Sequence, residues 1–402
     1  MDVVYMDNNA TTRVDPLVLE EMLPYFSNQY GNPSSMHSFG GAVGKKLDRA
    51  REQVQQLLGA EYDSEIIFTS CGTESDSSAI LSALAAYPQR REIITSVVEH
   101  PAVLNLCEHL ERHEGYKVHY IPVDRLGRLN MGAFEAALSD KVAVVSIMYA
   151  NNETGTIFPI ETLARMAKER GVLFHTDAVQ AVGKIPLDMK NSAVDMLSLS
   201  GHKLHAPKGV GALYVRRGTR FRPFLRGGHQ ERGRRAGTEN TTGIIGLGKA
   251  AELAMHYLEV ENTTVRALRD RLERGILEQV SHAFATGDLE NRLPNTSSIA
   301  FEYVEGEAIL LLLSRAGIAA SSGSACTSGS LEPSHVLRAM DIPYTAAHGT
   351  IRFSLSREST EADVDRVIDA TPRIIAQLRL LSPYWGEDGP VDAGKAFAPV
   401  YA

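Results

Sequence analysis

Short apolar segments rich in β-branched residues alternate with helical segments along most of the chain. The helical segments, residues 77–87, 102–112 and 160–171, carry apolar residues at the spacing of an amphipathic helix. Strand–helix alternation predicts an α/β fold with a mainly parallel sheet that helices cover on both faces. Ligands of such sheets bind beyond the carboxyl ends of the strands. The predicted strands are residues 65–70, 92–98, 117–123, 142–150, 171–178 and 194–200.

The pattern changes after the glycine-rich stretch RGGHQERGRRAGTENTTGIIGLG, residues 226–248. A long helical segment, roughly Thr241 to Val280, precedes an apolar strand at 295–304, a helix at 305–317 and a strand at 350–358. This arrangement predicts a second, smaller α+β domain.

The chain is long enough for two domains, because 402 residues exceed the usual size of a single core. We expect a large domain over residues 16–260. Residues 1–15 and 261–402 would form the small domain, which carries the loop around Cys326 and the C-terminal tail. The tail, residues 382–402, is rich in Gly and Pro, which predicts an extended segment that packs on a surface or on a partner.

Composition and charge exclude several classes of protein. Hydrophobic residues make up 44% and charged residues 22% of the chain, as in ordinary soluble globular proteins. The longest apolar run, Ala308 to Leu313, is too short to span a bilayer, and the first residues lack the pattern of a signal peptide. A net charge of −8 argues against a nucleic-acid surface, so we expect the arginines of residues 226–235 to lie on a solvated loop. These features predict a cytoplasmic protein that binds neither membranes nor nucleic acid.

The chain has three cysteines, Cys71, Cys107 and Cys326, and none is spaced as CxxC. This usage suits a reducing compartment and excludes a disulfide framework or a multi-cysteine metal site within one chain. We expect Cys107 to be buried on the apolar face of its helix, and Cys71 to pack near the end of the strand before it. Cys326 lies in SSGSACTSGS, where an exposed free thiol is a liability. It is either a tolerated accident or a thiol that has to move.

Polar clusters follow the predicted strands of the large domain. After the strand at 65–70, Gly72 and Thr73 open a helix, with a possible capping box from Thr73 to Asp76. The N–H groups and hydroxyl at such a helix start suit a phosphate, although capping alone explains Thr73 equally well. After the strand at 142–150 come Asn151 and Asn152.

Two further clusters carry charged groups. Asp177 ends an apolar strand and Gln180 follows one turn later, where a simple helix cap is the alternative explanation. Lys203 follows the strand at 194–200, behind Ser200 and His202, and a lysine in such a place can form a Schiff base with a carbonyl cofactor. Pyridoxal phosphate needs a phosphate cradle, a carboxylate for its ring nitrogen, a donor to its ring oxygen and a lysine for its aldehyde. The clusters supply these groups as Thr73, Ser200 and His202, then Asp177, Gln180 and Lys203.

These segments resemble the cysteine desulfurases of the NifS type, in the class-V aminotransferase family of fold-type I pyridoxal-phosphate enzymes. The resemblance covers essentially the whole chain and departs from the family at no motif position that would remove a catalytic group. It runs through YMDNNATTRVDP, YGNPSSMHSFG, TSCGTES, VEHPAV, NNETGTIFPI, HTDAVQAVGK, SGHKLHAPKGVG, RAGTEN, SSGSACTSGSLEPSHVLRAM and KAFAPVY. It implies a fold-type I transferase with a large α/β domain and a smaller α+β C-terminal domain.

The resemblance also implies roles for the groups around the cofactor ring. Lys203 would bind pyridoxal 5′-phosphate covalently and move the α-proton of the substrate. Asp177 would pair with the ring nitrogen, and Gln180 would bond the ring oxygen. His100 would stack on the ring and assist proton transfer, although a helix-start residue without a catalytic role is the alternative.

Further residues are implied for the phosphate and the substrate. Thr238 would reach the phosphate of the other subunit's cofactor, which implies a homodimer. Asn152, beside the cofactor, and Arg352 would bind the substrate carboxylate, for which a guanidinium fork is suited. The alternative for Arg352 is a structural ion pair. The phosphate ligands of the same chain would be Gly72, Thr73, Ser200 and His202.

The activity that the resemblance implies is removal of sulfur from L-cysteine, giving L-alanine and a persulfide on Cys326. A NifU-like scaffold for iron–sulfur clusters of nitrogenase would accept the sulfur. The persulfide would contact a cluster on that partner only transiently, and no resident metal is implied. One alternative is a selenocysteine lyase, or another lyase or aminotransferase on the same cofactor, although the latter reactions need no mobile thiol. A sulfur carrier or assembly adaptor is the alternative of another class, against which the intact cofactor constellation argues.

Overall fold

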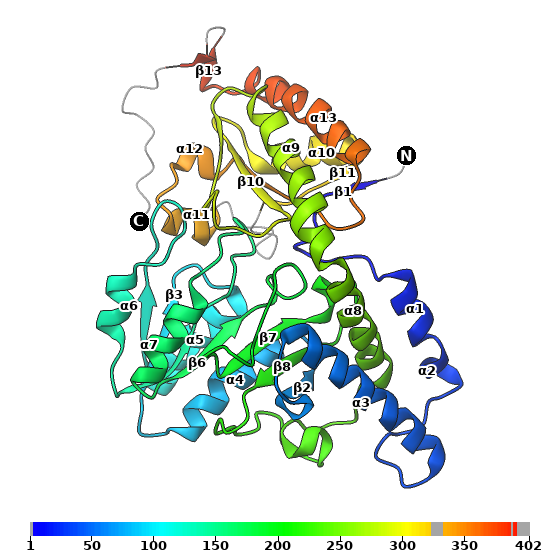
Figure 1. Cartoon of the computed structure of the whole chain (residues 1–402). Coiled ribbons are helices and arrows are strands. Elements are labelled where there is room, and N and C mark those ends of the chain that lie inside the picture. The colour runs from blue at the N-terminus through cyan, green and yellow to red at the C-terminus, as the bar shows by residue number, and fades with distance from the viewer. Residues whose placement is uncertain (1–2, 323–332, 387–388, 392–402) are drawn as a thin grey trace.

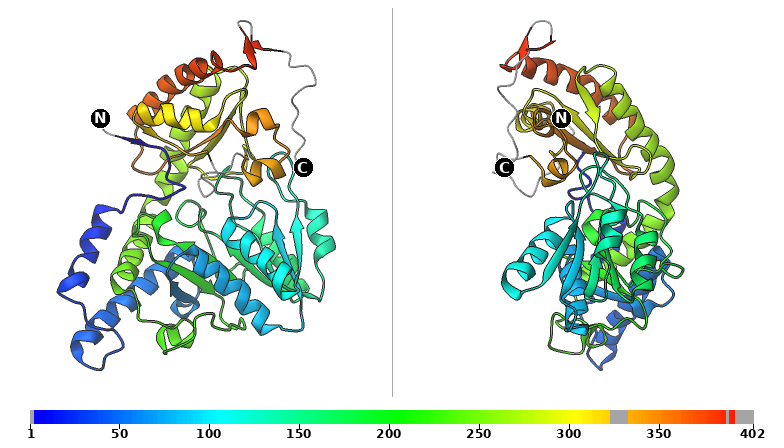
Figure 2. Two further views of the ribbon diagram at one scale, coloured as in Figure 1. Left: turned by 180° about the vertical axis from the view of Figure 1, so that it is seen from behind. Right: turned by 90° about the vertical axis from the view of Figure 1, so that its left-hand side faces the viewer.

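The computed structural model describes residues 3–322, 333–386 and 389–391. Cys326 and the KAFAPVY segment lie outside these residues. A larger part holds the main sheet, and a smaller part stacks on its upper end (Figure 1). The dark blue N-terminal segment starts in the smaller part and runs down to helices α1 (Pro16–Met22) and α2 (Pro24–Ser27) beside the larger part (Figure 2, left).

The larger part is built around a seven-stranded sheet with the order β2-β8-β7-β6-β5-β3-β4. β8 runs antiparallel to both of its neighbours, and the other neighbouring pairs are parallel. The predicted mainly parallel sheet is therefore confirmed, and each predicted strand segment contains one of its strands. The strands are β2 (Ile66–Thr69), β3 (Glu92–Ser96), β4 (Lys117–Ile121), β5 (Val142–Ser146), β6 (Leu173–Asp177), β7 (Met196–Ser200) and β8 (Gly211–Val215).

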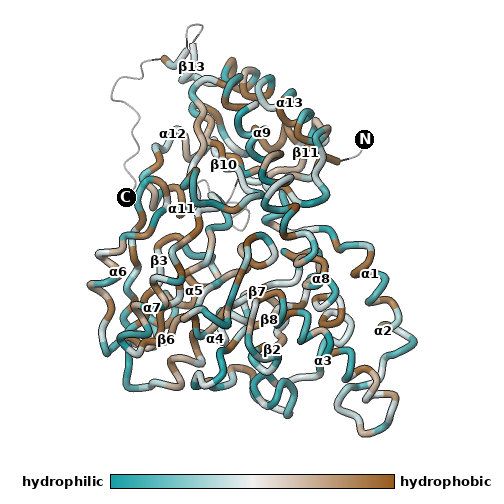
Figure 3. Tube along the Cα trace, viewed as in Figure 1, coloured by the Kyte–Doolittle hydropathy of each residue, from teal (hydrophilic) through white to brown (hydrophobic). Residues whose placement is uncertain are grey.

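Helices cover both faces of this sheet. Neighbouring residues of one strand point to opposite faces, and on each face they pack in a different apolar cluster. Phe68 belongs to the main cluster, whereas its neighbour Ile67 packs in a second cluster with α4 and α5. Figure 3 shows the apolar stretches along β2, β3 and β6. The covering helices are α3 (Ser38–Leu58), α4 (Gly72–Ala86), α5 (Pro101–Glu114), α6 (Met131–Ala137), α7 (Ile160–Glu169) and α8 (Thr241–Val260). In the described residues no helix is long and apolar enough to cross a membrane.

The smaller part contains a three-stranded antiparallel sheet with the order β12-β10-β9. Strand β1 (Val4–Tyr5) pairs in parallel with β11 (Ile318–Ala319), so the N-terminus belongs to this part. Val4 and Met6 share its apolar cluster with residues from beyond Glu261. The other elements are β9 (Ala283–Ala285), β10 (Thr296–Phe301), β12 (Thr350–Ser354), α9 (Arg266–Leu277), α10 (Gly306–Arg315), α11 (His335–Ala339), α12 (Tyr344–Ala347), α13 (Glu361–Arg379), β13 (Trp385–Gly386) and β14 (Gly389–Pro390).

The predicted long helical segment spans both parts. Helix α8 ends at Val260, and a π-helical turn, Glu261–Val265, joins it to α9. The division into domains at residues 260 and 261 stays a prediction. The buried apolar residues of α8 belong to the main cluster, whereas those of α9, after this turn, belong to the cluster of the smaller part.

Candidate active site

A cavity of about 270 Å³ lies where β6 and β7 end, beside the first turn of α4. It is lined by every predicted site residue that the structure describes, apart from Thr238. Arg352 reaches it from β12, so the cavity lies between the two parts of the molecule. The lining residues that were predicted are Gly72, Thr73, His100, Asn152, Asp177, Gln180, Ser200, His202, Lys203 and Arg352.

Lys203 is presented to the cavity by a tight turn. The chain leaves β7 at Ser200 and makes one 3₁₀ turn, Gly201–Lys203. A Cβ on Gly201 would lie 2.9 Å from a methyl carbon of Val210, so this turn requires glycine. The Lys203 Nζ donates hydrogen bonds to the backbone oxygen of Ala10, at 2.7 Å, and to that of Asn9. The N-terminal segment therefore holds the amine in place.

Asp177 faces the same cavity from the end of β6 and is buried. Its Oδ1 accepts a hydrogen bond of 2.9 Å from the N–H of Val179. Residues 179–184 form turns rather than a helix, so the helix-cap alternative for Asp177 is wrong. Burial raises the pKa of the Asp177 carboxyl, and the charges of His100 and Lys203 act against this rise. The carboxylate therefore lies within electrostatic reach of a lysine and a histidine in the same cavity.

His100 is both a helix-start residue and a cavity residue. It is the N-cap of α5, and its Nδ1 accepts a hydrogen bond of 3.1 Å from the N–H of Ala102. Because Nδ1 accepts, the neutral ring carries its hydrogen on Nε2. Burial lowers the pKa of His100, with Asp177 acting in the opposite direction, so the ring is neutral at physiological pH. The remaining Nε2–H is a donor that a ligand in the cavity can use.

The start of α4 forms one end of the cavity. Its N-cap, Cys71, makes no capping hydrogen bond, so the first N–H groups of this helix stay available to a ligand. A Cβ on Gly72 would lie 2.9 Å from a methyl carbon of Val179, so the chain packs closely here. The capping box predicted from Thr73 to Asp76 is wrong. The Glu74 carboxylate instead accepts a hydrogen bond of 2.8 Å from the N–H of Ser70 and pairs with Arg235.

Ser200 and His202 lie next to this helix start along the cavity wall. Ser200 is buried at the end of β7. His202 hydrogen-bonds through Nδ1 to the hydroxyl of Thr11, at 3.1 Å. Burial, aided by the charges of Lys203 and Lys208, lowers the pKa of His202 to about 4. The ring is therefore neutral at physiological pH and can act as a hydrogen-bond donor.

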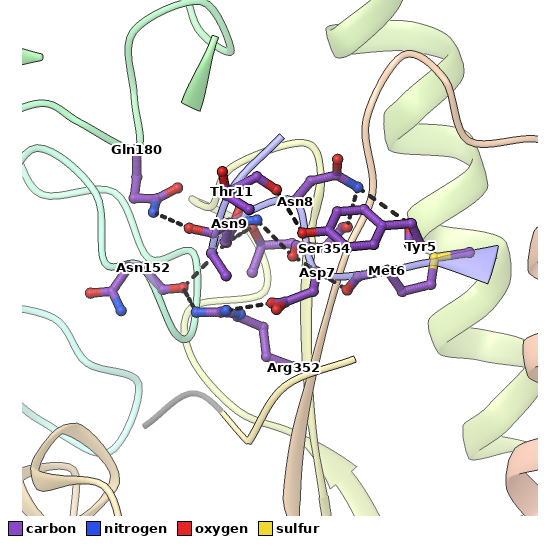
Figure 4. Close-up of polar contacts among 12 residues, drawn as sticks. Tyr5, Met6, Asp7, Asn8, Asn9, Thr11, Asn152, Gln180, Arg352 and Ser354 are labelled. Atoms are coloured by element: carbon purple, nitrogen blue, oxygen red, sulfur yellow. Dashed lines mark hydrogen bonds and ion pairs between the residues drawn. The ribbon is translucent and has the colours of Figure 1, made fainter. Parts of the chain in front are cut away.

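Arg352 forms the opposite wall, in contact with Asn152 and Asp7 (Figure 4). One terminal nitrogen donates to the backbone oxygen of Asn152 and the other to the Asp7 carboxylate, both at 2.8 Å. The ion-pair alternative for Arg352 thus describes a real contact. Its buried Nε has no hydrogen-bond partner among the described residues. The same side chain therefore combines an ion pair with a place in the cavity wall.

Three site residues were missed by the sequence analysis. Asn9 and Asp76 line the cavity, and Lys184 lies behind it against Gln180. Asp76 is buried, and its Oδ1 has no hydrogen-bond partner in the described part of the chain, although His175 Nε2 lies 3.6 Å away. Asp76 lies one turn after Gly72 in the polar start of α4, GTESDSS, and this position was a signal for Asp76. The polar run DNNATT near the N-terminus was a signal for Asn9, but only tertiary structure brings it to Lys203.

Two predicted residues are not in the cavity. Thr238 is exposed on the arginine-rich loop, residues 216–240, and does not line the cavity of its own chain. Cys326 lies outside the described residues. After that segment, the Ser334 hydroxyl donates to the Glu153 carboxylate at 2.5 Å. His335 Nε2 bonds the backbone oxygen of Glu99 at 2.9 Å.

The other two cysteines differ from each other. Cys107 is fully buried, as predicted, and burial raises the pKa of its thiol to about 12. Cys71 is half-buried and lines the cavity at the start of α4. Across the described ranges, no group of three or more His, Cys, Asp or Glu side chains is placed to hold a metal ion.

Comparisons with known proteins agree with this arrangement. The family model described as aminotransferase class-V matches residues 4–367. A cysteine desulfurase NifS of Azotobacter vinelandii is 70% identical over 399 residues, 99% of each chain. A cysteine desulfurase of Gluconacetobacter diazotrophicus is 68% identical over 402 residues, 100% of each chain.

Solved structures give the same family. A structure described as a NifS-like protein is 41% identical, with a TM-score of 0.87, and the match covers 94% of this chain and 100% of that one. Another, described as SspA in complex with cysteine, is 35% identical with a TM-score of 0.78, over 89% of this chain and 99% of that one. The predicted fold-type I architecture is confirmed. The chain belongs to the class-V aminotransferase family and, within it, to the cysteine desulfurases of the NifS type.

Proposed function

We propose that this protein removes sulfur from L-cysteine with the help of pyridoxal 5′-phosphate and passes the sulfur to Cys326. The Cys326 thiol takes the sulfur atom, the substrate keeps its carbon skeleton as L-alanine, and the products are L-alanine and a persulfide. The observation that carries the proposal is a cavity that brings Lys203, Asp177 and an uncapped helix start together.

The cavity residues fit pyridoxal 5′-phosphate. The N–H groups at the start of α4, with the close packing at Gly72, suit the phosphate. The Asp177 carboxylate suits a protonated ring nitrogen, the Gln180 amide suits the ring oxygen, and Lys203 is the amine for a covalent bond. When bound, the cofactor supplies an electron sink for the α-carbon of the substrate.

Each residue has a separate task in this proposal. Lys203, held near Asn9 and Ala10, takes the α-proton of the substrate and returns a proton to the product. Asp177 would keep the ring nitrogen protonated, because a buried carboxylate next to this nitrogen stabilises its positively charged form. His100 would lie against the ring, where its Nε2–H would be a donor for the reacting groups.

The substrate carboxylate would bind between Arg352 and Asn152. Asp7 and the backbone oxygen of Asn152 fix the two terminal nitrogens of the guanidinium. Each terminal nitrogen keeps a second N–H beside the one that Asn152 or Asp7 uses, and these N–H groups can donate to a ligand carboxylate. The positive charge near this point favours an α-amino acid over a neutral amine.

We also propose a homodimer in which Thr238 reaches the phosphate of the partner's cofactor. Exposed apolar side chains gather on the segment from α1 to the start of α3, which is unusual for a free surface. Phe26 is 63% exposed, Tyr30 70%, and Met36 fully exposed. Phe224 and Leu225 are also exposed, on the loop that carries Thr238. A second copy of the chain would cover such a surface.

The sulfur acceptor in this proposal is a NifU-like scaffold that assembles iron–sulfur clusters for nitrogenase. Support comes from the NifS name of the Azotobacter vinelandii relative. A cytoplasmic location suits three cysteines without a disulfide framework. Any iron–sulfur cluster would belong to the partner, and contact with Cys326 would be transient.

The decisive experiment compares the wild type with Cys326→Ala. Both proteins are incubated with L-cysteine and a reductant, and L-alanine and sulfide are measured together. We expect equal amounts of the two products from the wild type and essentially none from Cys326→Ala, which should still fold and bind the cofactor. Without reductant, the wild-type peptide that carries Cys326 should gain one sulfur atom, about 32 Da. Normal turnover in Cys326→Ala, or extra sulfur on Cys71 or Cys107, contradicts the proposal.

A further inference from the structure

The side-chain amide of Gln180 is held between two groups of opposite hydrogen-bonding character. Lys184 Nζ donates to Gln180 Oε1 at 2.9 Å. Gln180 Nε2 donates to the backbone oxygen of Asn9 at 3.0 Å (Figure 4). All three residues are buried.

These two contacts allow only one orientation of the amide. The backbone oxygen of Asn9 accepts hydrogen bonds and cannot donate, so it requires an N–H of Gln180 whether Lys184 is charged or neutral. A flipped Gln180 amide would place its oxygen against the oxygen of Asn9 and its N–H groups against Lys184. Buried polar groups left without partners cost free energy, so the flipped state is excluded. The Nε2 atom has two hydrogens, and the one not used by Asn9 is available to the cavity that Gln180 lines.

Lys184 is itself fixed by a larger network. Its Nζ also donates to Asn9 Oδ1 at 3.0 Å, and Asn9 Nδ2 donates to the hydroxyl of Thr296 at 2.9 Å. Thr296 begins β10, so the network ties the cavity wall to the smaller sheet. Burial lowers the pKa of Lys184 to about 7, with the charge of Glu261 acting against this change. Even the neutral amine has two N–H groups, which is enough for its two acceptors.

We propose that Lys184 is a positioning residue that, together with Asn9, fixes Gln180 so that an N–H faces the ring oxygen of the bound cofactor. This inference rests on the proposed function. Lys184 is not among the residues that line the cavity, so it acts through Gln180 and does not touch the cofactor. Lys184 therefore contributes indirectly, through Gln180, to binding of the ring oxygen of the cofactor.

The test measures binding of deoxypyridoxine phosphate to the cofactor-free protein by calorimetry. This analogue keeps the ring oxygen and the phosphate but has no aldehyde, so it cannot bond covalently to Lys203. The variants are Lys184→Met, Gln180→Leu and the double variant. We expect Gln180→Leu to weaken binding about tenfold and Lys184→Met by about three- to tenfold. In the Gln180→Leu background, Lys184→Met should add less than about twofold, because the two residues act as one unit.

Matched controls separate positioning from general stability. Lys190→Met changes an exposed lysine in the same connection and should bind like the wild type. Lys184→Gln keeps an N–H donor and should restore most of the affinity, which also provides a test if Lys184→Met does not fold. Folding of every variant is checked by thermal unfolding without the analogue.

The outcomes distinguish this inference from the proposed function. If the wild type does not bind the analogue, the cofactor site is wrong and both proposals fail. If the wild type binds but Lys184→Met behaves like Lys190→Met, only the positioning role fails. An equal loss from Lys184→Met with and without Gln180 would show a merely structural role and overturn the inference, as would failure of both Lys184 variants to fold.

Discussion

Two buried regions of the molecule hold charged side chains in different ways. Under the arginine-rich loop, both terminal nitrogens of Arg51 meet the Glu231 carboxylate, at 2.7 and 2.8 Å. In the cavity, Lys203 is held by backbone oxygens, and the Asp177 carboxylate accepts from a backbone N–H. The first arrangement joins two charged side chains directly, whereas these hydrogen bonds of Lys203 and Asp177 run to backbone groups.

This difference separates a structural task from a chemical one. The Arg51–Glu231 pair balances its own charges and fixes the loop against β2, because Glu231 also accepts from the N–H of Phe68 at 3.0 Å. In the cavity, burial keeps the pKa of Asp177 raised. A ligand with a positive ring nitrogen can therefore gain the free energy that an internal ion pair would have used.

The largest effect is expected from Lys203→Ala. The variant loses both the covalent attachment point and the proton carrier, so L-alanine formation should fall to background. Borohydride treatment of the wild type should fix the cofactor to the peptide that contains Lys203, as mass spectrometry would show. A label on Lys184 or Lys208 would contradict the assignment.

On the structural side of the comparison, we expect Arg51→Leu to lower the free energy of unfolding by about 3–5 kcal/mol, because it leaves Glu231 buried without its cation. Urea unfolding measures this change. Arg232→Leu is the matched control, since its ion pair with Asp63 is exposed at 3.3 Å and should contribute no more than about 1 kcal/mol. Equal losses in both variants would show that burial does not distinguish the two pairs.

Asp177→Asn tests the chemical side. An amide cannot favour a protonated ring nitrogen, so kcat/KM should fall by an amount equivalent to about 3–4 kcal/mol. The free energy of unfolding should change far less than in Arg51→Leu, because Asp177 holds no internal ion pair in the described structure. Near-normal turnover in this variant would assign the role to another group.

The smallest effect concerns His175, which lies between the hydroxyls of Ser146 and Ser198, each at 2.9 Å. Burial lowers the pKa of His175 to about 3, against about 6.5 in an unfolded chain. Between these two pKa values the unfolded chain binds a proton at His175 and the folded chain does not. The contribution of His175 to the free energy of unfolding is therefore fully present above pH 6.5 and decreases as the pH falls toward 3. The contribution is up to about 1.4 kcal/mol per pH unit. His175→Gln should reduce the slope of urea-derived stability between pH 6.5 and 5 without abolishing it, because His202 contributes in the same direction. An unchanged slope would contradict the burial argument.

The parts of the site that lie at strand ends could be predicted from the sequence. Asp177 and Lys203 directly follow apolar strands, and parallel strands bring their carboxyl ends to one edge. Asn9 could not be placed, because its contact with Lys203 joins positions far apart in the chain. The capping box failed because α4 begins at Gly72 with Cys71 as its N-cap, so Thr73 already lies inside the helix.

The smaller sheet was predicted as a set of elements but not as a neighbour of the N-terminus. Apolar periodicity indicated β10 and β12, and nothing local indicated that β1 would pair with β11. Strand β1 has two residues, too few for a pattern. The ion pair between Asp7 and Arg352 likewise joins the N-terminal segment to a distant strand, β12, so it could not be predicted from the sequence either.

The placement of the N-terminal segment also fixes when the site is completed during protein synthesis. Asn8 and Asn9 hydrogen-bond to the backbone oxygen and hydroxyl of Ser354, both at 2.9 Å. Residues 8 and 9 can make these two contacts only after β12 has been synthesised. Lys203 is synthesised roughly midway, but its backbone acceptors at Asn9 and Ala10 are positioned only then. We therefore expect the proposed cofactor to bind stably only late in chain maturation, once β12 has folded against residues 8 and 9.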